Sequence, residues 1–166
     1  MRLLTTLGVL LALCAPALAE DDPELIFKKS TVFRMFSPDA KLAVYAIDDP
    51  LIENVACHFT LPEVGGWKGW AGLAEEASDV SLACRQTGPI AIKGKFKQGE
   101  EAFRERRSIF FKKVQIVRGC DAKRNVLVYL MYTDKLIEGS PKNSTSAVPI
   151  MPWGTQEGPR CGDFLE

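Results

Sequence analysis

The sequence predicts a mainly β protein of the α+β class, folded as one compact domain with an antiparallel sheet, a sandwich or a barrel-like arrangement. Short apolar runs rich in β-branched and aromatic residues recur along the chain, as in strands. Clusters of Gly, Pro, Asp and Asn separate these runs and favour turns. Gly72–Ser78 is suited to a short helix, so we expect one or two short helices beside the strands.

Two strand-like runs open the domain, Leu25–Phe36 and Lys41–Asp49, and a Ser-Pro-Asp-Ala turn joins them. The second run is apolar on both faces from Leu42 to Ile47, which predicts a central strand. Pro50 ends this strand, because proline cannot donate to a ladder.

A third strand is expected over Asn54–Leu61. Because side chains alternate across a strand, Cys57 and Phe59 share one face and His58 takes the other. We therefore expect the single histidine on the surface or on an edge strand, where it cannot activate Cys57 as a thiolate. With one histidine and bridged cysteines, a zinc site is not expected.

The middle of the chain continues the β pattern. Residues 79–92 return to strand, and Lys93–Glu101 is expected to form a surface hairpin. Phe103–Cys120 follows as a long strand whose apolar phase slips near Lys112-Lys113. That slip indicates a bulge or a break.

The last third predicts a hairpin at the centre of the sheet. Cys120–Asn125 turns the chain, and Val126–Tyr132 runs back as an apolar strand. Ser146–Trp153 is then expected to cross the core as an extended segment, because its two prolines exclude a helix.

The first residues, 1–19, have the features of a cleaved export signal. Arg2 precedes the almost wholly apolar stretch Leu3–Leu13, and Ala17-Leu18-Ala19 matches the small-x-small pattern of signal peptidase. Cys14 follows a leucine rather than the small residue that lipidation needs. We therefore expect cleavage after Ala19, no lipid anchor, no membrane span and a periplasmic location.

The mature chain is almost neutral and is expected to be a single domain with a tail at residues 154–166. Arg2 is the only charged residue of the leader, so 21 basic and 21 acidic residues become 20 and 21, a formal charge of −1. Nucleic-acid binding depends on a basic face that neutralises phosphates, so no nucleic-acid partner is expected.

Four cysteines remain after the leader, and they permit three disulfide connectivities. Cys57 and Cys84 lie in strand-like runs that flank one loop segment, which favours pairing them. Cys161 lies in the Gly/Pro-rich tail, which has little apolar content to dock by itself, so a Cys120–Cys161 bridge would hold it. No C-x-x-C motif is present, which favours structural bridges over thiol redox chemistry.

Polar detail is concentrated at loops, so loops supply the candidate binding residues. The Gly-rich loop "GGWKGWAG" lacks the G-K-[ST] ending of a phosphate loop, and Glu75 and Glu76 would already satisfy a helix start there. We interpret it as a structural or partner-binding loop, and we expect no cofactor and no metal. The candidate binding residues are Trp67, Lys68, Trp70, Lys123, Arg124, Lys135 and Lys142.

An enzyme is the alternative, with carboxylates as its acid–base groups. No G-x-S-x-G or H-E-x-x-H motif is present, so no serine nucleophile or metalloprotease helix can be nominated. Sequence spacing does not place any two carboxylates in a shared pocket. The candidates are Asp48, Asp49, Glu75 and Asp79, with Glu76 and Asp134 as further members.

Three long segments make the chain resemble the CreA family of small exported bacterial proteins: "TVFRMFSPDAKLAVYAIDDPLIENVACHFT", "GGWKGWAGLAEEASDVSLACRQTGPI" and "SIFFKKVQIVRGCDAKRNVLVYLMYTDKLIEGSPKNSTSAVPIMPW". The resemblance implies a CreA-like domain over residues 20–153 and carries no established activity or catalytic residue. The family name suggests gene regulation, but an export signal argues against direct action on DNA. The cysteine-bearing tail departs from the shorter family pattern, which suggests that the second bridge is an addition.

These observations favour a binding or interaction protein of the cell envelope, whose partner is an envelope protein or a small ligand. An enzyme acting on a small or envelope substrate is the second hypothesis.

Overall fold

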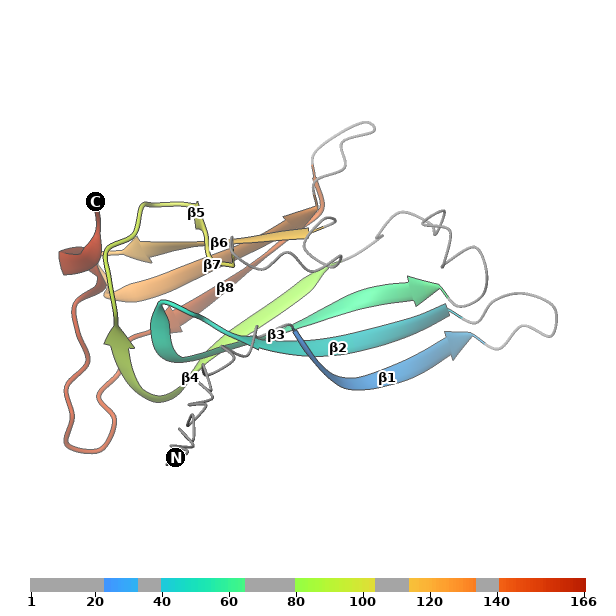
Figure 1. Ribbon diagram of the computed structural model, residues 1–166, viewed down its shortest axis with the longest axis horizontal. Coiled ribbons are helices and arrows are strands. Elements are labelled where there is room, and N and C mark those ends of the chain that lie inside the picture. The colour runs from blue at the N-terminus through green and yellow to red at the C-terminus, as the bar shows by residue number, and fades with distance from the viewer. Residues whose placement is uncertain (1–22, 33–39, 65–79, 104–113, 134–140) are drawn as a thin grey trace, which may run out of the picture.

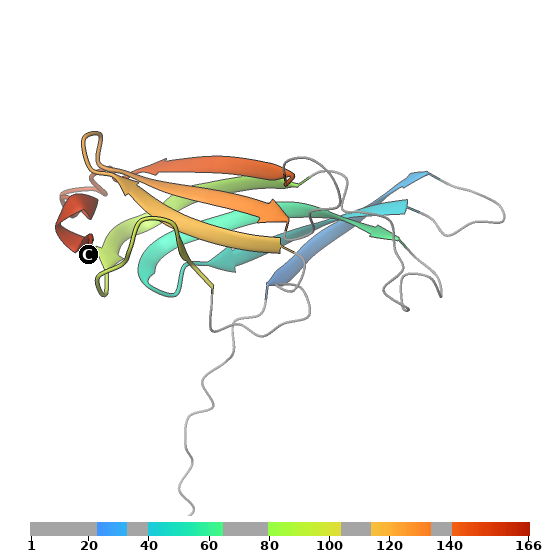
Figure 2. The same cartoon turned by 90° about the horizontal axis from the view of Figure 1, so that it is seen from above.

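The computed structural model describes residues 23–32, 40–64, 80–103, 114–133 and 141–166. These residues form two four-stranded antiparallel sheets that pack against each other (Figures 1 and 2), so the predicted mainly β fold is confirmed. Among them the helical element is a 3-10 turn, η2 (Cys161–Phe164). The helix expected at Gly72–Ser78 lies outside the described residues.

Each sheet follows the order of the chain, β1-β2-β3-β4 and β5-β6-β7-β8. The first sheet consists of β1 (Glu24–Val32), β2 (Ala40–Asp48), β3 (Ile52–Val64) and β4 (Ser81–Ile92). The second consists of β5 (Glu100–Glu101), β6 (Val114–Asp121), β7 (Val126–Thr133) and β8 (Asn143–Pro149). The β6–β7 hairpin occupies the centre of its sheet, and β2 lies between two neighbours, as predicted. The bulge or break expected near Lys112-Lys113 lies outside the described residues.

The core lies between the two sheets and follows the period-two alternation of the strands. Cys57 and Phe59 are buried on β3 and His58 is exposed on the opposite face, as expected. β3 is an internal strand, so this histidine is a surface residue and not an edge residue. The second sheet contributes buried side chains at alternate positions: Val114, Ile116, Cys120, Leu127, Tyr129, Met131 and Val148.

The disulfides are Cys57–Cys84 and Cys120–Cys161, the pairing that the sequence favours. The first joins directly opposed residues of β3 and β4 inside the core. The second ties η2 in the tail to the end of β6. Within the part of the chain that the structure describes, no helix is long and apolar enough to cross a membrane.

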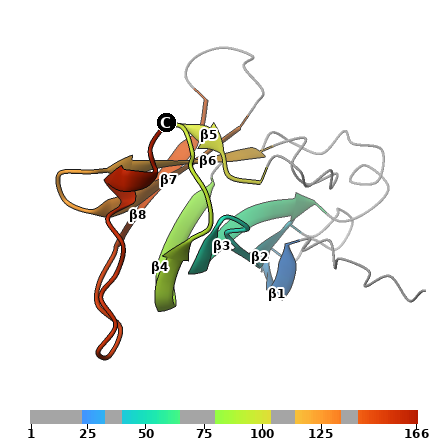
Figure 3. The same ribbon diagram turned by 60° about the vertical axis from the view of Figure 1, so that its left-hand side comes forward.

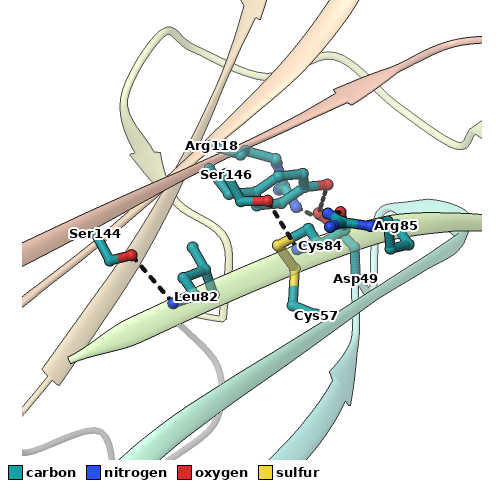
Figure 4. Close-up of a disulfide and its surroundings, with 9 residues drawn as sticks. Asp49, Cys57, Leu82, Cys84, Arg85, Arg118, Ser144 and Ser146 are labelled. Carbon is teal, nitrogen blue, oxygen red and sulfur yellow. Dashed lines mark hydrogen bonds and ion pairs between the residues drawn. A yellow bond between two sulfur atoms is a disulfide. The ribbon is translucent and has the colours of Figure 1, made fainter.

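The two sheets meet along one side, where serine hydroxyls of β8 accept hydrogen bonds from the backbone of β4 (Figure 4). The Leu82 N–H donates to Ser144 Oγ at 3.1 Å, and the Cys84 N–H donates to Ser146 Oγ at 2.8 Å. Side chains therefore satisfy the edge of β4 at this seam, where an unpaired buried N–H would be costly.

We expect Ser146→Ala to lower the free energy of unfolding by about 1–3 kcal/mol, because the buried Cys84 N–H would lose its acceptor. Urea denaturation of the mature chain measures the change. Thr145→Ala, at the neighbouring exposed position of β8, is the matched control and should change stability by no more than about 0.5 kcal/mol. An equal loss in both variants would contradict a specific role for the seam.

Two sequence expectations about the surface need correction. The Lys93–Glu101 hairpin exists as a turn before β5, but Phe96 within it is fully buried. Its backbone pairs with the tail, donating to the Phe164 carbonyl and accepting from the Glu166 N–H, which holds its side chain against the core.

The second correction concerns Ser146–Trp153. Only its first part crosses the core, with Ser146, Val148 and Ile150 buried at alternate positions. Met151 and Trp153 are exposed, and the chain turns at Gly154, which adopts a φ of 64°. The turn closes through reciprocal backbone hydrogen bonds between Trp153 and Gln156.

Candidate functional site

The tip of the β6–β7 hairpin carries two of the candidate binding residues, Lys123 and Arg124. Arg124 donates to the Asp121 carboxylate from its backbone at 3.2 Å and from its guanidinium at 2.7 Å. These hydrogen bonds lower the pKa of Asp121 below its usual range, so the carboxylate stays charged. Lys123 is exposed at the apex of the turn. The tip therefore has a braced backbone and displays positive charge.

The C-terminal tail packs against this tip and fixes its position (Figure 3). The Asn125 side-chain amide accepts from the Cys161 N–H at 2.8 Å and donates to the Pro159 carbonyl at 3.0 Å. One side chain therefore makes two hydrogen bonds to the backbone of the tail. The Cys120–Cys161 bridge adds a covalent tie. Gly162 approaches Ala122 so closely that a Cβ at Gly162 would lie 3.0 Å from the Ala122 Cβ. Tip and tail thus form one unit.

A shallow groove of about 320 Å³ opens beside the tip, on the outer face of β6 and β7. Its lining is mainly apolar and includes Val117, Val128 and Leu130, together with Asp121. Gln98 lies at its margin, where its amide accepts from the Cys120 N–H at 2.8 Å and donates to the Cys120 carbonyl at 2.7 Å.

Gly119, which also lines the groove, allows this arrangement. A Cβ there would lie 2.6 Å from Gln98 Oε1, so a side chain would displace the Gln98 amide from the strand. The Gln98 side of the groove is therefore fixed by two hydrogen bonds to the Cys120 backbone.

The exposed loop after β8 is a feature that sequence reasoning missed. Met151 is 59% exposed and Trp153 is 48% exposed. The backbone of Met151 is held on both sides by the Gln86 amide, at 3.0 and 2.9 Å, so the loop is anchored where it leaves the sheet. The signal available in the sequence was the pair of turn-forming residues around the tryptophan, Pro152 and Gly154.

Lys142 does not belong to the same surface as Lys123 and Arg124. The eight residues of β7 separate the tip from the Thr133–Lys142 end, where the Thr133 N–H donates to the Lys142 carbonyl. Eight strand residues span roughly 26 Å. The remaining candidates, Trp67, Lys68, Trp70 and Lys135, lie outside the described residues.

Asp49, a carboxylate of the enzyme hypothesis, lies in a buried network that joins the two sheets (Figure 4). Its Oδ1 accepts from the Leu51 N–H at 2.8 Å, the Ile52 N–H at 3.0 Å and an Arg118 guanidinium nitrogen at 2.6 Å. Its Oδ2 accepts from the Tyr129 hydroxyl at 2.8 Å. With both oxygens engaged, Asp49 is placed as a structural anion.

Arg118 has a second acidic partner, Glu100, at 2.8 Å, and its guanidinium lies 5.7 Å from the Phe96 ring centroid. Burial alone would lower the pKa of Arg118, but the charges of Asp49 and Glu100 raise it. Burial raises the pKa of Tyr129, and the neighbouring Asp49 charge raises it further. The cluster therefore holds a paired cation, two anions and a neutral phenol.

The other carboxylates of the enzyme hypothesis do not join Asp49. Asp48 is the last residue of β2 and is exposed, whereas Asp49 follows the strand and is buried, so the two side chains take opposite faces. Glu75, Glu76, Asp79 and Asp134 lie outside the described residues. Across the described ranges no group of three or more His, Cys, Asp and Glu side chains is arranged to hold a metal ion.

Comparison with known proteins gives a consistent result. The family described as CreA protein matches residues 26–153 of this chain. "Protein CreA" from Escherichia coli strain K12 is 51% identical over 134 residues, which cover 78% of this chain and 85% of that protein. The proteins of the same name from Escherichia coli O6:H1 and O157:H7 give the same identity and coverage. No solved structure matches the chain significantly.

Proposed function

We propose a function from the surface of the chain itself, because the chain belongs to the CreA family and membership of this family indicates no specific activity. It is a periplasmic binding protein of the cell envelope, and its partner is another envelope protein. The partner docks on the tip surface, which consists of Lys123, Arg124 and the adjoining groove lined by Val117, Val128 and Leu130.

The observation that carries this proposal is an apolar groove whose lining includes Asp121, the residue that braces the charged turn. Apolar lining supplies contact area, and charged groups beside it would fix orientation and favour one class of partner. The tail, its disulfide and two side-chain amides hold the surface in place, which lowers the entropic cost of binding. The charge displayed by Lys123 would favour an acidic segment on the partner.

Export to the periplasm is supported by the leader at residues 1–19 and by the two disulfides, which are typical of oxidising compartments. The enzyme hypothesis receives no comparable support. The Asp49 carboxylate accepts four hydrogen bonds from structural partners. Neither Asp48 nor Asp49 lines the groove beside the tip.

We expect Lys123→Glu/Arg124→Glu to reduce recovery of the partner at least about tenfold, because reversed charges would repel an acidic segment and each 1.4 kcal/mol is a factor of ten. The measurement is quantitative pull-down of envelope proteins by the mature chain, followed by titration of the recovered partner. Val128→Asp, which places a charge in the groove, should give a similar loss.

Lys142→Glu is the matched control, because it reverses one charge at the opposite end of β7. It should leave recovery unchanged. Equal recovery by the wild-type chain, the tip variant and the groove variant would contradict docking at the tip surface.

A further inference from the structure

Strand β1 is the outermost strand of the first sheet (Figures 1 and 3). It is unusually apolar for an edge strand. Leu25, Ile26 and Phe27 are consecutive and are 45%, 46% and 56% exposed. Edge strands present unpaired backbone groups that another strand can complete, and soluble domains rarely expose runs of apolar residues without a use for them. This edge is therefore suited to pairing with another strand.

A bulge in β1 decides which of its side chains share a face. Leu25 lies opposite Tyr45 and Phe27 lies opposite Val44, so Ile26 is the extra residue. Without the bulge, Glu24 and Lys29 would point to opposite faces, because they are an odd number of positions apart.

With the bulge, Glu24 lies opposite Ala46 and Lys29 lies opposite Leu42, two β2 positions on the same face. Phe27 shares this face through its partner Val44. Leu42 is itself 41% exposed there. One face of the edge therefore presents, in order along the strand, an acidic, an apolar and a basic side chain.

We propose that β1 pairs antiparallel with β1 of a second copy of this chain and forms a two-fold dimer with a continuous sheet. In the register that places Ile26 opposite Phe27 of the other copy, Glu24 of each copy lies opposite Lys29 of the other. The pattern is self-complementary, as a two-fold interface requires. The bulge makes this register consistent, because Glu24 and Lys29 then lie on one face of the joined sheet.

The charge pattern selects a second copy as the occupant. The Glu24–Lys29 contact between copies forms twice by symmetry, and the apolar centre is covered by the same residues of the other chain. Because each copy contributes a single strand, we expect a weak, concentration-dependent dimer of modest area. Bulges and lysines can also serve to keep a monomeric edge unpaired, so the monomer is the competing outcome.

The test is sedimentation velocity of the mature chain over a concentration series, with Glu24→Lys and Lys29→Glu as separate variants. Each variant alone places like charges opposite each other twice and should weaken self-association at least about tenfold. An equimolar mixture of the two should regain association, because both contacts between unlike copies are again attractive. Lys95→Glu, an exposed charge reversal outside β1, should leave the dimer unchanged.

The possible results separate cleanly. Loss in both single variants and recovery in the mixture would establish the interface and its register. A chain that remains monomeric at every concentration overturns the proposal. A dimer that tolerates both charge reversals also overturns it, because self-association would then occur through another surface. Thermal unfolding of each variant verifies that the fold is intact, as expected for substitutions at exposed positions.

Discussion

Asp49→Ala is expected to destabilise the protein by about 3–5 kcal/mol, a loss comparable to the total stability of many domains. The substitution leaves Arg118 buried, with 5% of its side chain exposed, and removes the closer of its two anionic partners. It also deprives the Tyr129 hydroxyl and two backbone N–H groups of their acceptor. Urea denaturation of the mature chain measures the loss.

Asp48→Ala is the matched control, because it removes the adjacent carboxylate from the exposed end of β2. It should cost no more than about 1 kcal/mol, as exposed charges usually do. A second variant isolates the ion pair. Arg118→Met in the Asp49→Ala background should restore part of the lost stability, because it removes the unpaired buried charge. If the double variant is as unstable as the sum of the single variants, the network contributes no coupling between the sheets.

Local features of the fold follow from the sequence because they depend on neighbours along the chain. The β6–β7 hairpin follows from two apolar runs joined by a polar turn, and the burial of Cys57 and Phe59 follows from strand alternation. Division of the strands between two sheets does not follow, because it depends on contacts across the core. At the seam between β4 and β8, serine hydroxyls of β8 accept hydrogen bonds from the β4 backbone. The spacing of these serines in the sequence does not predict that contact.

The sequence contains a pattern that predicts the buried charged network. Val114, Ile116 and Arg118 occupy every second position of β6, so the arginine is in phase with the buried face. Asp49 continues the buried phase of Ile47 in the same way. A charged residue at a position expected to be buried predicts an oppositely charged partner. The sequence does not identify that partner, because Asp49 and Arg118 lie 69 positions apart. Alternation would place Asp48 and Asp49 on opposite faces, but the sequence alone does not say which of the two faces the core.

The candidate binding residues show the same limit. Lys123 and Lys142 flank the predicted strand Val126–Tyr132, so the sequence already indicates that they lie toward its opposite ends, as β7 shows. The sequence does not indicate which end lies beside a groove. The groove beside Lys123 depends on Gly119 and the Gln98 amide, which lie far enough apart in the chain that their contact could not be foreseen.

Replacing both cysteines of the second bridge by serine is expected to lower the free energy of unfolding by roughly 4 kcal/mol at most, the chain-entropy value for a loop of this length. The two cysteines are 41 positions apart, and the bridge joins the tail to the end of β6. The other ties of the tail are noncovalent: the Asn125 amide, the backbone pairing between Phe96 and the residues around Leu165, the packing of Phe164 and Leu165 against the core, and an exposed Lys97–Glu166 ion pair. Local opening of the tail should therefore precede global unfolding.

Hydrogen exchange of the Cys161 and Glu166 amides, measured beside urea denaturation, separates local opening from global loss. In the Cys120→Ser/Cys161→Ser variant both amides should exchange much faster, while amides of the β6–β7 ladder keep protection close to the global stability. Asn125→Gly is the matched control, because glycine tolerates the φ of 53° at this position, removes the amide contacts and keeps the covalent tie. Rapid exchange of the Glu166 amide in the Asn125 variant but not in the disulfide variant would show that the amide holds the tail and that the bridge is secondary.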